Sequence, residues 1–174
     1  MDKTQRKYAF SWDFIGDVQS GRPCLGQETT VAVYRLFMYS LRDVLETHCG
    51  AEGADALLRE AGFLAGRQFA EHFIGRQETL NAFFLGAQKA LREQKIGVLR
   101  MELAEPDNGH FVLTVSEDVD CSGLPETGFS VCVYDEGFIA GLFFYHSGRR
   151  FHVREVDCWC TGDRTCRFEV HTDG

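Results

Sequence analysis

The chain has 174 residues, a formal net charge of −8 and a sequence pI near 5.2. This length fits one domain with a substantial core, and the acidic balance opposes nucleic-acid binding, because neutralising phosphates requires a basic face. The N-terminus has no apolar run behind its charges, and the most apolar stretch, residues 137–145, is far shorter than the roughly 20 residues that span a bilayer. We therefore expect a soluble, cytoplasmic protein without a signal peptide or membrane span.

Residues 1–26 are expected to form an extended N-terminal arm, and residues 27–174 a single domain. Glycine and proline residues interrupt any helix in the arm. Its aromatic residues alternate, which indicates either a short strand or an arm that packs on an apolar surface, of its own domain or of a second subunit. These aromatic residues are Tyr8, Phe10, Trp12 and Phe14.

Three amphipathic helices are predicted after the arm. Apolar residues recur at helical spacing over residues 28–48, 51–73 and 78–94. Gly50 supplies a stop between the first two helices. The pair Gly62 and Gly66 in the second helix is typical of close helix packing.

The hydrophobic period then changes from helical to alternating. Residues 97–105 and 109–117 alternate around a Pro-Asp-Asn-Gly turn, which indicates a hairpin. A loop over 118–128, a helix over 129–145 and a closing hairpin with strands at 154–159 and 165–171 follow. The order predicts an α+β fold, with N-terminal helices packed on a roughly four-stranded antiparallel sheet that has one inserted helix.

Cysteines near the C-terminus have the spacing of a metal site. Cys158 and Cys166 flank the predicted turn, Glu155 precedes them and Cys132 lies upstream. Thiolates suit Zn²⁺, which takes four ligands, and one carboxylate can complete a set of three sulfurs. Glu155 and Cys158 would face opposite sides of a regular strand, so this ligand set requires a bulge or the end of the strand between them.

An all-cysteine site is the competing interpretation of the same region. Cys160 shares its strand face with Cys158 and would replace Glu155, giving the set Cys132, Cys158, Cys160 and Cys166. The cysteines elsewhere are interpreted as small buried hydrophobic residues. They are Cys24, Cys49 and Cys121.

The run Glu155-x2-Cys158-x7-Cys166, with Cys132 upstream, resembles the 4-vinyl reductase domain family, and so does the N-terminal phrase GDVQSGRPCLGQETTVAVYRLFMYSLRDVL. The family includes aromatic-sensing modules of phenol-responsive activators, bacteriochlorophyll-synthesis accessory proteins and stand-alone hydrocarbon-binding proteins. The resemblance implies a structural Zn²⁺ on these four residues that clips the inserted helix to the C-terminal hairpin. It also implies a fold similar to that of Golgi-tethering subunits, which dimerise, and we therefore expect a homodimer.

Fifteen phenylalanines are many for a core of this size, and several lie on elements that should converge around an apolar cavity. The resemblance implies that such a cavity holds an aromatic or hydrocarbon ligand. Phenol-sensing relatives grip the ligand hydroxyl with a His and a Trp in mid-domain, whereas the tryptophans here are Trp12 and Trp159. The candidate ligand-binding residues are Phe69, Phe73, Phe83, Phe84, His110, Phe111, Phe138 and Phe143.

The sequence therefore favours a non-catalytic domain that binds and senses a small aromatic, hydrocarbon or lipid-like molecule and passes the signal to an unidentified downstream protein. No nucleotide-binding or nucleophile motif is visible, and a metal with four protein ligands has no open position for a substrate. Two alternatives stay open. One is an accessory protein or enzyme in tetrapyrrole 4-vinyl reduction, although no nicotinamide or flavin determinant is visible. The other is a dimeric scaffold protein.

Overall fold

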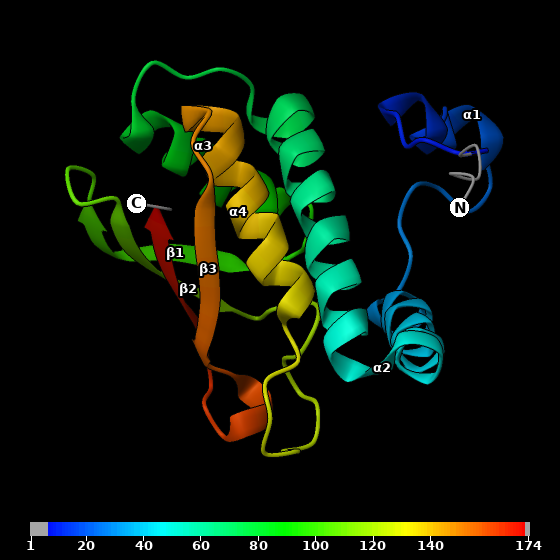
Figure 1. Ribbon diagram of the computed structural model, residues 1–174. Helices are drawn as coiled ribbons and strands as arrows, with labels where there is room; N and C mark the ends of the chain where they lie inside the picture. Colours follow the sequence, from blue (N-terminus) through cyan, green and yellow to red (C-terminus); the bar gives the residue numbers. More distant parts are fainter. Residues whose placement is uncertain (1–6, 173–174) are drawn as a thin grey trace.

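The structure is a computed structural model and describes residues 7–172. Four strands form one antiparallel sheet in the order β1-β2-β4-β3 (Figure 1). The predicted α+β architecture is confirmed. The strands are β1 (Val98–Glu105), β2 (His110–Ser116), β3 (Phe151–Asp157) and β4 (Cys166–Thr172).

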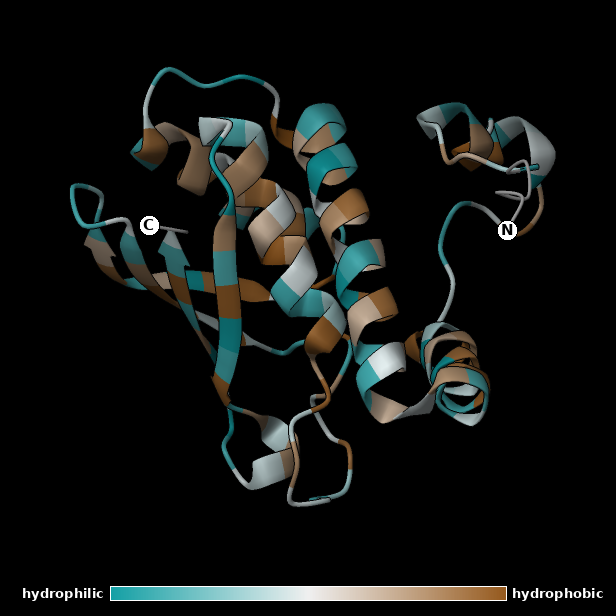
Figure 2. Cartoon of the chain, in the orientation of Figure 1, coloured by the Kyte–Doolittle hydropathy of each residue, from teal (hydrophilic) through white to brown (hydrophobic). Residues whose placement is uncertain are grey.

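Helices cover one face of this sheet, and the other face is open. The inserted helix α4 (Val133–Ser147) packs on β3, and α3 (Leu80–Glu93) packs on β1. Along β3, Val153 and Glu155 face the helices and are buried while His152 and Arg154 are exposed, as the alternating colours of that strand show (Figure 2). This alternation is the pattern expected of an antiparallel sheet with a single covered face.

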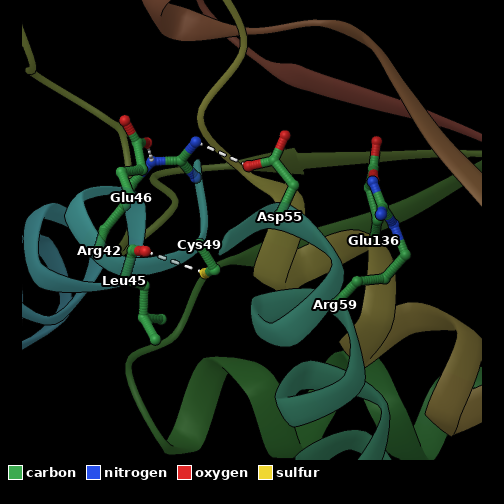
Figure 3. Close-up of polar contacts among 7 residues, drawn as sticks. All are labelled: Arg42, Leu45, Glu46, Cys49, Asp55, Arg59 and Glu136. Atoms are coloured by element: carbon green, nitrogen blue, oxygen red, sulfur yellow. Dashed lines mark hydrogen bonds and ion pairs between the residues drawn. The ribbon is translucent and has the colours of Figure 1, made fainter. Parts of the chain in front are cut away.

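The long helix α2 (Val31–Phe69) is two helices joined by a kink at Gly50. Gly50 has φ 72° and ψ 170°, a conformation that residues with a Cβ atom rarely adopt, so the predicted stop is confirmed. Arg42 ties the two halves together, because it lies 2.7 Å from both Glu46 in its own half and Asp55 beyond the kink (Figure 3). The helix continues into a short π-helical turn, η2 (Ala70–Ile74).

The second half of α2 crosses α4 at backbone-to-backbone contact, with α4 lying between it and β3 (Figure 1). A Cβ atom added at Gly62 would lie 2.0 Å from the carbonyl oxygen of Tyr134, and one at Gly66 would lie 2.0 Å from that of Phe138. The close packing predicted for this glycine pair is confirmed. Two glycines of α4 with the same spacing meet the backbone of α2 equally closely, and they are Gly137 and Gly141.

Glu136 of α4 joins three elements beside this crossing. Its Oε2 accepts a hydrogen bond from Arg59 Nη2 of α2 at 2.6 Å (Figure 3). Its Oε1 accepts from the backbone N–H of Glu155 in β3 at 2.9 Å. A buried carboxylate with a guanidinium and an amide partner is well satisfied, so Glu136 fixes α4 against both neighbours.

The N-terminal segment differs from the prediction of an extended arm or strand. Residues Trp12–Ile15 form a 3-10 turn, η1, and Val18–Gly21 form a one-turn helix, α1; residues 1–6 of the predicted arm lie outside the described residues. Asp17 caps α1 by accepting from the backbone N–H of Ser20 at 2.9 Å, which stabilises one turn despite the flanking glycines. The ring of Trp12 stacks on His72 of η2 at 3.9 Å between centroids, so this segment packs on the domain through an aromatic contact.

Candidate metal centre and adjoining cavity

Four cysteine side chains converge at the end of the sheet where β4 begins. The Sγ atoms of Cys121, Cys132, Cys158 and Cys166 all lie within 4.8 Å of one another, and all four residues are fully buried. Cys121 belongs to the loop between β2 and α4, and Cys132 is the N-cap residue of α4. Cys158 directly follows β3, and Cys166 is the first residue of β4.

The separations of the sulfur atoms fit a bound ion. A tetrahedral site with metal–sulfur bonds of about 2.3 Å has sulfur–sulfur edges of about 3.8 Å. Cys132 Sγ lies 3.9 Å from Sγ of both Cys158 and Cys166. The Sγ atoms of Cys121 and Cys166 lie 3.1 Å apart, so these two would have to separate by about 0.7 Å to complete the tetrahedron. The four free thiols could therefore hold a metal ion.

Three of the predicted ligands are in this cluster, and Cys121 supplies the fourth sulfur. The sequence alone favours ordinary core packing for Cys121, because nothing in its acidic loop resembles a ligand motif. Cys160, the alternative fourth ligand, is buried outside the four-sulfur group. Its carbonyl oxygen instead accepts hydrogen bonds from the N–H groups of Thr127 and Gly128 at 2.9 and 3.0 Å.

Glu155, the predicted carboxylate ligand, lies beside the cluster on β3. It is 6% exposed, and neither carboxylate oxygen has a hydrogen-bond partner among the residues that the structure describes. The register of β3 against β4 shifts between Glu155 and Asp157, at the place where the ligand set requires a bulge. Burial, followed by the charge of Cys158, raises the pKa of Glu155 to about 8. Its role as a ligand stays a prediction.

An apolar cavity lies between α3, α4 and the sheet. Its free volume of about 30 Å³ has room for about two water molecules. Its lining is largely aliphatic and aromatic, and four of the predicted ligand-binding residues contribute to it. They are Phe83, Phe84, Phe138 and Phe143.

The other four candidate ligand-binding residues lie outside this lining. Phe69 and Phe111 are buried in the surrounding core. Phe73 is exposed in η2. His110 begins β2, and its ring stacks on that of His171 at 4.5 Å between centroids. The structure therefore brings the predicted phenylalanines of α3 and α4 together in one cavity and leaves His110 apart from them.

The polar part of the cavity lining consists of Asp118 and Asp135, which sequence reasoning missed. Carboxyl oxygens of both residues lie within 4.8 Å of each other and of Cys132 Sγ, so the cavity adjoins the cysteine cluster. Burial, followed by the charge of Asp120, raises the pKa of Asp118 to about 7. Burial, followed by the charge of Asp118, raises the pKa of Asp135 well above its usual range. In the sequence, both aspartates occupy positions typical of solvated carboxylates, a loop and the first turn of a helix.

The first half of α2 holds the loop between β2 and α4 in place. Arg35 donates from Nε to the carbonyl oxygen of Val119 at 2.7 Å and from Nη2 to that of Ser122 at 2.9 Å. The hydroxyl of Tyr34 donates to Asp120 Oδ1 at 2.5 Å. These contacts position the loop that supplies both Cys121 and Asp118.

The fold and site together define an α+β module with an apolar cavity beside a buried cysteine cluster. Residues 111–172 match the 4-vinyl reductase domain, and the chain therefore carries a domain of this family in its C-terminal part. This segment contains all four clustered cysteines and both cavity aspartates.

Two uncharacterised proteins of Methanocaldococcus jannaschii are similar to the chain in sequence. One is 28% identical over 127 residues, which cover 73% of this chain and 68% of the relative. The other is 26% identical over 102 residues, which cover 57% of this chain and 61% of the relative. The chain thus spans about two thirds of the length of each relative.

Three solved structures share the fold. A vinyl-4-reductase family protein from Methanocaldococcus jannaschii has a TM-score of 0.63 and 16% identity, covering 98% of this chain and all of that one. The phenol-responsive sensory domain of the transcription activator PoxR, solved with phenol, has a TM-score of 0.61 and 17% identity, covering 84% and 76%. Subunit 3 of a trafficking protein particle complex from Naegleria fowleri, covalently bound to palmitic acid, has a TM-score of 0.61 and 15% identity, covering 83% and 95%.

The compartment and the relation to membranes receive one observation. Within residues 7–172, no helix combines the length and the apolar character needed to cross a bilayer.

Proposed function

We propose that this chain is a non-catalytic domain that binds a small apolar or aromatic molecule and reports its presence to another protein. The observation that carries the proposal is the apolar cavity between α3, α4 and the sheet, with two carboxyl groups in its lining. Pockets of this composition, mostly apolar with a few placed polar groups, are typical of small-molecule sites. The PoxR domain with phenol and the trafficking subunit with palmitic acid support it, because both hold apolar guests on this fold.

The small free volume suggests how binding would be sensed. A dry cavity that holds benzene has a volume of about 150 Å³, whereas this cavity offers about 30 Å³. A guest would therefore displace rings such as Phe83 and Phe84, both on α3. The loop after α3 is joined to the loop held by α2, because the N–H of Val119 donates to the carbonyl oxygen of Ile96 at 2.9 Å. A ligand that favours an opened α3 would thus shift the contacts of α2, and such differential affinity for two conformations is what a sensor requires.

The proposed ion in the cysteine cluster is zinc in a structural role. Four thiolates form a set that zinc accepts tetrahedrally, and four protein ligands leave no open coordination position. Such an ion would join α4 to the ends of β3 and β4 and to the loop of Cys121. It would therefore contribute to folding and supply no reactive water.

Native mass spectrometry of the purified protein tests the binding function. We expect an additional mass that is released on denaturation with organic solvent, or uptake of an added aromatic compound when none is carried through purification. Failure to bind any apolar compound would contradict the proposal. Nicotinamide-dependent reduction of a vinyl tetrapyrrole by the purified chain would contradict it independently, in favour of an enzyme.

A homodimer through the first half of α2 is part of the proposal. An apolar stripe at helical spacing faces solvent there, with Leu36 72% and Phe37 65% exposed and with Val33 and Val44 on the same side. Exposed apolar patches of this kind mark interaction surfaces, and a second copy of the same stripe would cover it symmetrically.

Phe37→Glu is expected to convert this dimer into a monomer, because the interface would bury a charge without a partner. Native mass or sedimentation at micromolar concentration measures the change. Leu85→Glu is a matched control, since Leu85 is exposed on α3, away from the stripe, and should leave the dimer intact. A wild-type protein that sediments as a monomer would rule the interface out.

A further inference from the structure

The cavity has a chemically distinct end formed by Asp118 and Asp135. All the other side chains that line it are apolar. The two aspartates come from different elements, the loop after β2 and the first turn of α4, and their carboxyl oxygens approach within 4.8 Å of each other. The fold thus concentrates the acceptors of the cavity at one place.

Acceptor capacity at this end is not used by the protein. Asp118 is 3% exposed, and its Oδ1 accepts from the backbone N–H of Asp120 at 2.7 Å. Oδ2 of Asp118 and Oδ2 of Asp135 are both buried and have no hydrogen-bond partner among residues 7–172. Buried polar atoms without partners are rare and costly, and each one calls for an explanation such as an absent ligand.

Nearby donors are occupied elsewhere. The guanidinium of Arg35 donates to backbone carbonyl oxygens of the loop, at 2.7 Å for Val119 and 2.9 Å for Ser122. The hydroxyl of Tyr34 donates to Asp120. No described cationic side chain forms an ion pair with Asp118 or Asp135. This end of the cavity therefore presents a negative, acceptor-only surface to a guest.

We propose that the cavity selects apolar molecules that carry a hydrogen-bond-donating head group, a hydroxyl or an amine, which donates to Asp118 and Asp135. This inference rests on the proposed binding function and specifies its ligand class. A carboxylate head is disfavoured, because it would bring a third negative group to two carboxyls in a site of low dielectric constant. The specificity would differ in this respect from binding that depends on an acidic head group.

Four probes with similar rings separate head-group recognition from simple apolar burial: toluene, phenol, benzylamine and benzoate. Calorimetry or ligand-observed NMR measures their dissociation constants for the full chain. We expect phenol or benzylamine to bind about tenfold to a hundredfold more tightly than toluene, since a hydrogen bond to a charged acceptor contributes on this scale. Benzoate should bind more weakly than toluene. Comparison of phenol with benzylamine distinguishes a neutral head from a cationic one.

Asp135→Leu should abolish the preference over toluene while toluene itself still binds. Asp135→Asn, which keeps one acceptor oxygen and nearly the same shape, should reduce the preference and provides a second variant if the leucine protein fails to fold. Glu136→Gln is the matched control, because Glu136 is the next residue of α4 but faces Arg59, and its variant should rank the probes as the wild type does.

The possible failures are distinguishable. Toluene binding as tightly as phenol and benzylamine, or benzoate binding best, would overturn the head-group inference and leave the binding function standing. Unchanged preference in both Asp135 variants would overturn it as well. Binding of none of the four probes would overturn the proposed function and the inference together.

Discussion

Replacement of Gly66 by alanine is expected to reduce the free energy of unfolding by about 3 kcal/mol or more, the upper range of overpacking effects. The new Cβ atom would lie 2.0 Å from the carbonyl oxygen of Phe138, and this backbone atom of α4 cannot rotate away as a side chain can. Alanine is a better helix former than glycine by up to about 1 kcal/mol, so the clash outweighs the gain. Chemical denaturation measures the change, which should lower the midpoint temperature by roughly 6–12 °C in a domain of this size.

Two other glycines provide graded controls. A Cβ atom at Gly86 in α3 would approach only the methyl tip of the Ile74 side chain, at 2.9 Å, so the cost should be much smaller. At Gly21 in α1 nothing lies within 4 Å, and alanine should change stability by less than about 0.5 kcal/mol. If Gly66→Ala behaves like Gly21→Ala, then α2 and α4 do not cross at backbone contact in solution.

The elements of the fold could be predicted from local pattern, because each has one buried face. The strands predicted at 97–105 and 109–117 are found at 98–105 and 110–116. The kink at Gly50 and the helix crossing at Gly62 and Gly66 followed from the positions of the glycines alone. The N-terminal turns were missed because one capping carboxylate, Asp17, outweighed the nearby glycines.

The site could be predicted only in part, since half of it depends on one loop. Cys158 and Cys166 flank a turn, so their proximity is local and visible in the sequence. Cys121 and Asp118 reach the site because α2 clasps their loop through Arg35, a contact between residues more than 80 positions apart. Asp135 enters the cavity because it lies one turn inside α4 from Cys132, whose position the cluster fixes. Such placements depend on tertiary packing, and no local spacing records them.

Loss of Cys166 is expected to have the largest effect on the protein. The purified wild type should contain about one zinc per chain, and Cys166→Ala should lose it together with several kcal/mol of stability, because structural zinc carries a large apparent folding free energy. Elemental analysis and thermal unfolding measure the two effects. Cys24→Ala, which removes an exposed thiol far from the cluster in sequence, should change neither. Retention of zinc in Cys166→Ala would exclude the cluster as the metal site.

A comparison of Cys121→Ala with Glu155→Gln then identifies the fourth ligand. The four-sulfur geometry leads us to expect zinc loss in Cys121→Ala and zinc retention in Glu155→Gln. Glutamine keeps the shape of the buried side chain, so a loss of metal in that variant would reflect the carboxylate as a ligand and not a packing defect. The reverse outcome would establish the set Cys132, Glu155, Cys158 and Cys166 and make Cys121 a neighbour of the ion. Because Cys132 adjoins both the cluster and the two cavity aspartates, ligand affinity should fall in whichever variant loses the metal.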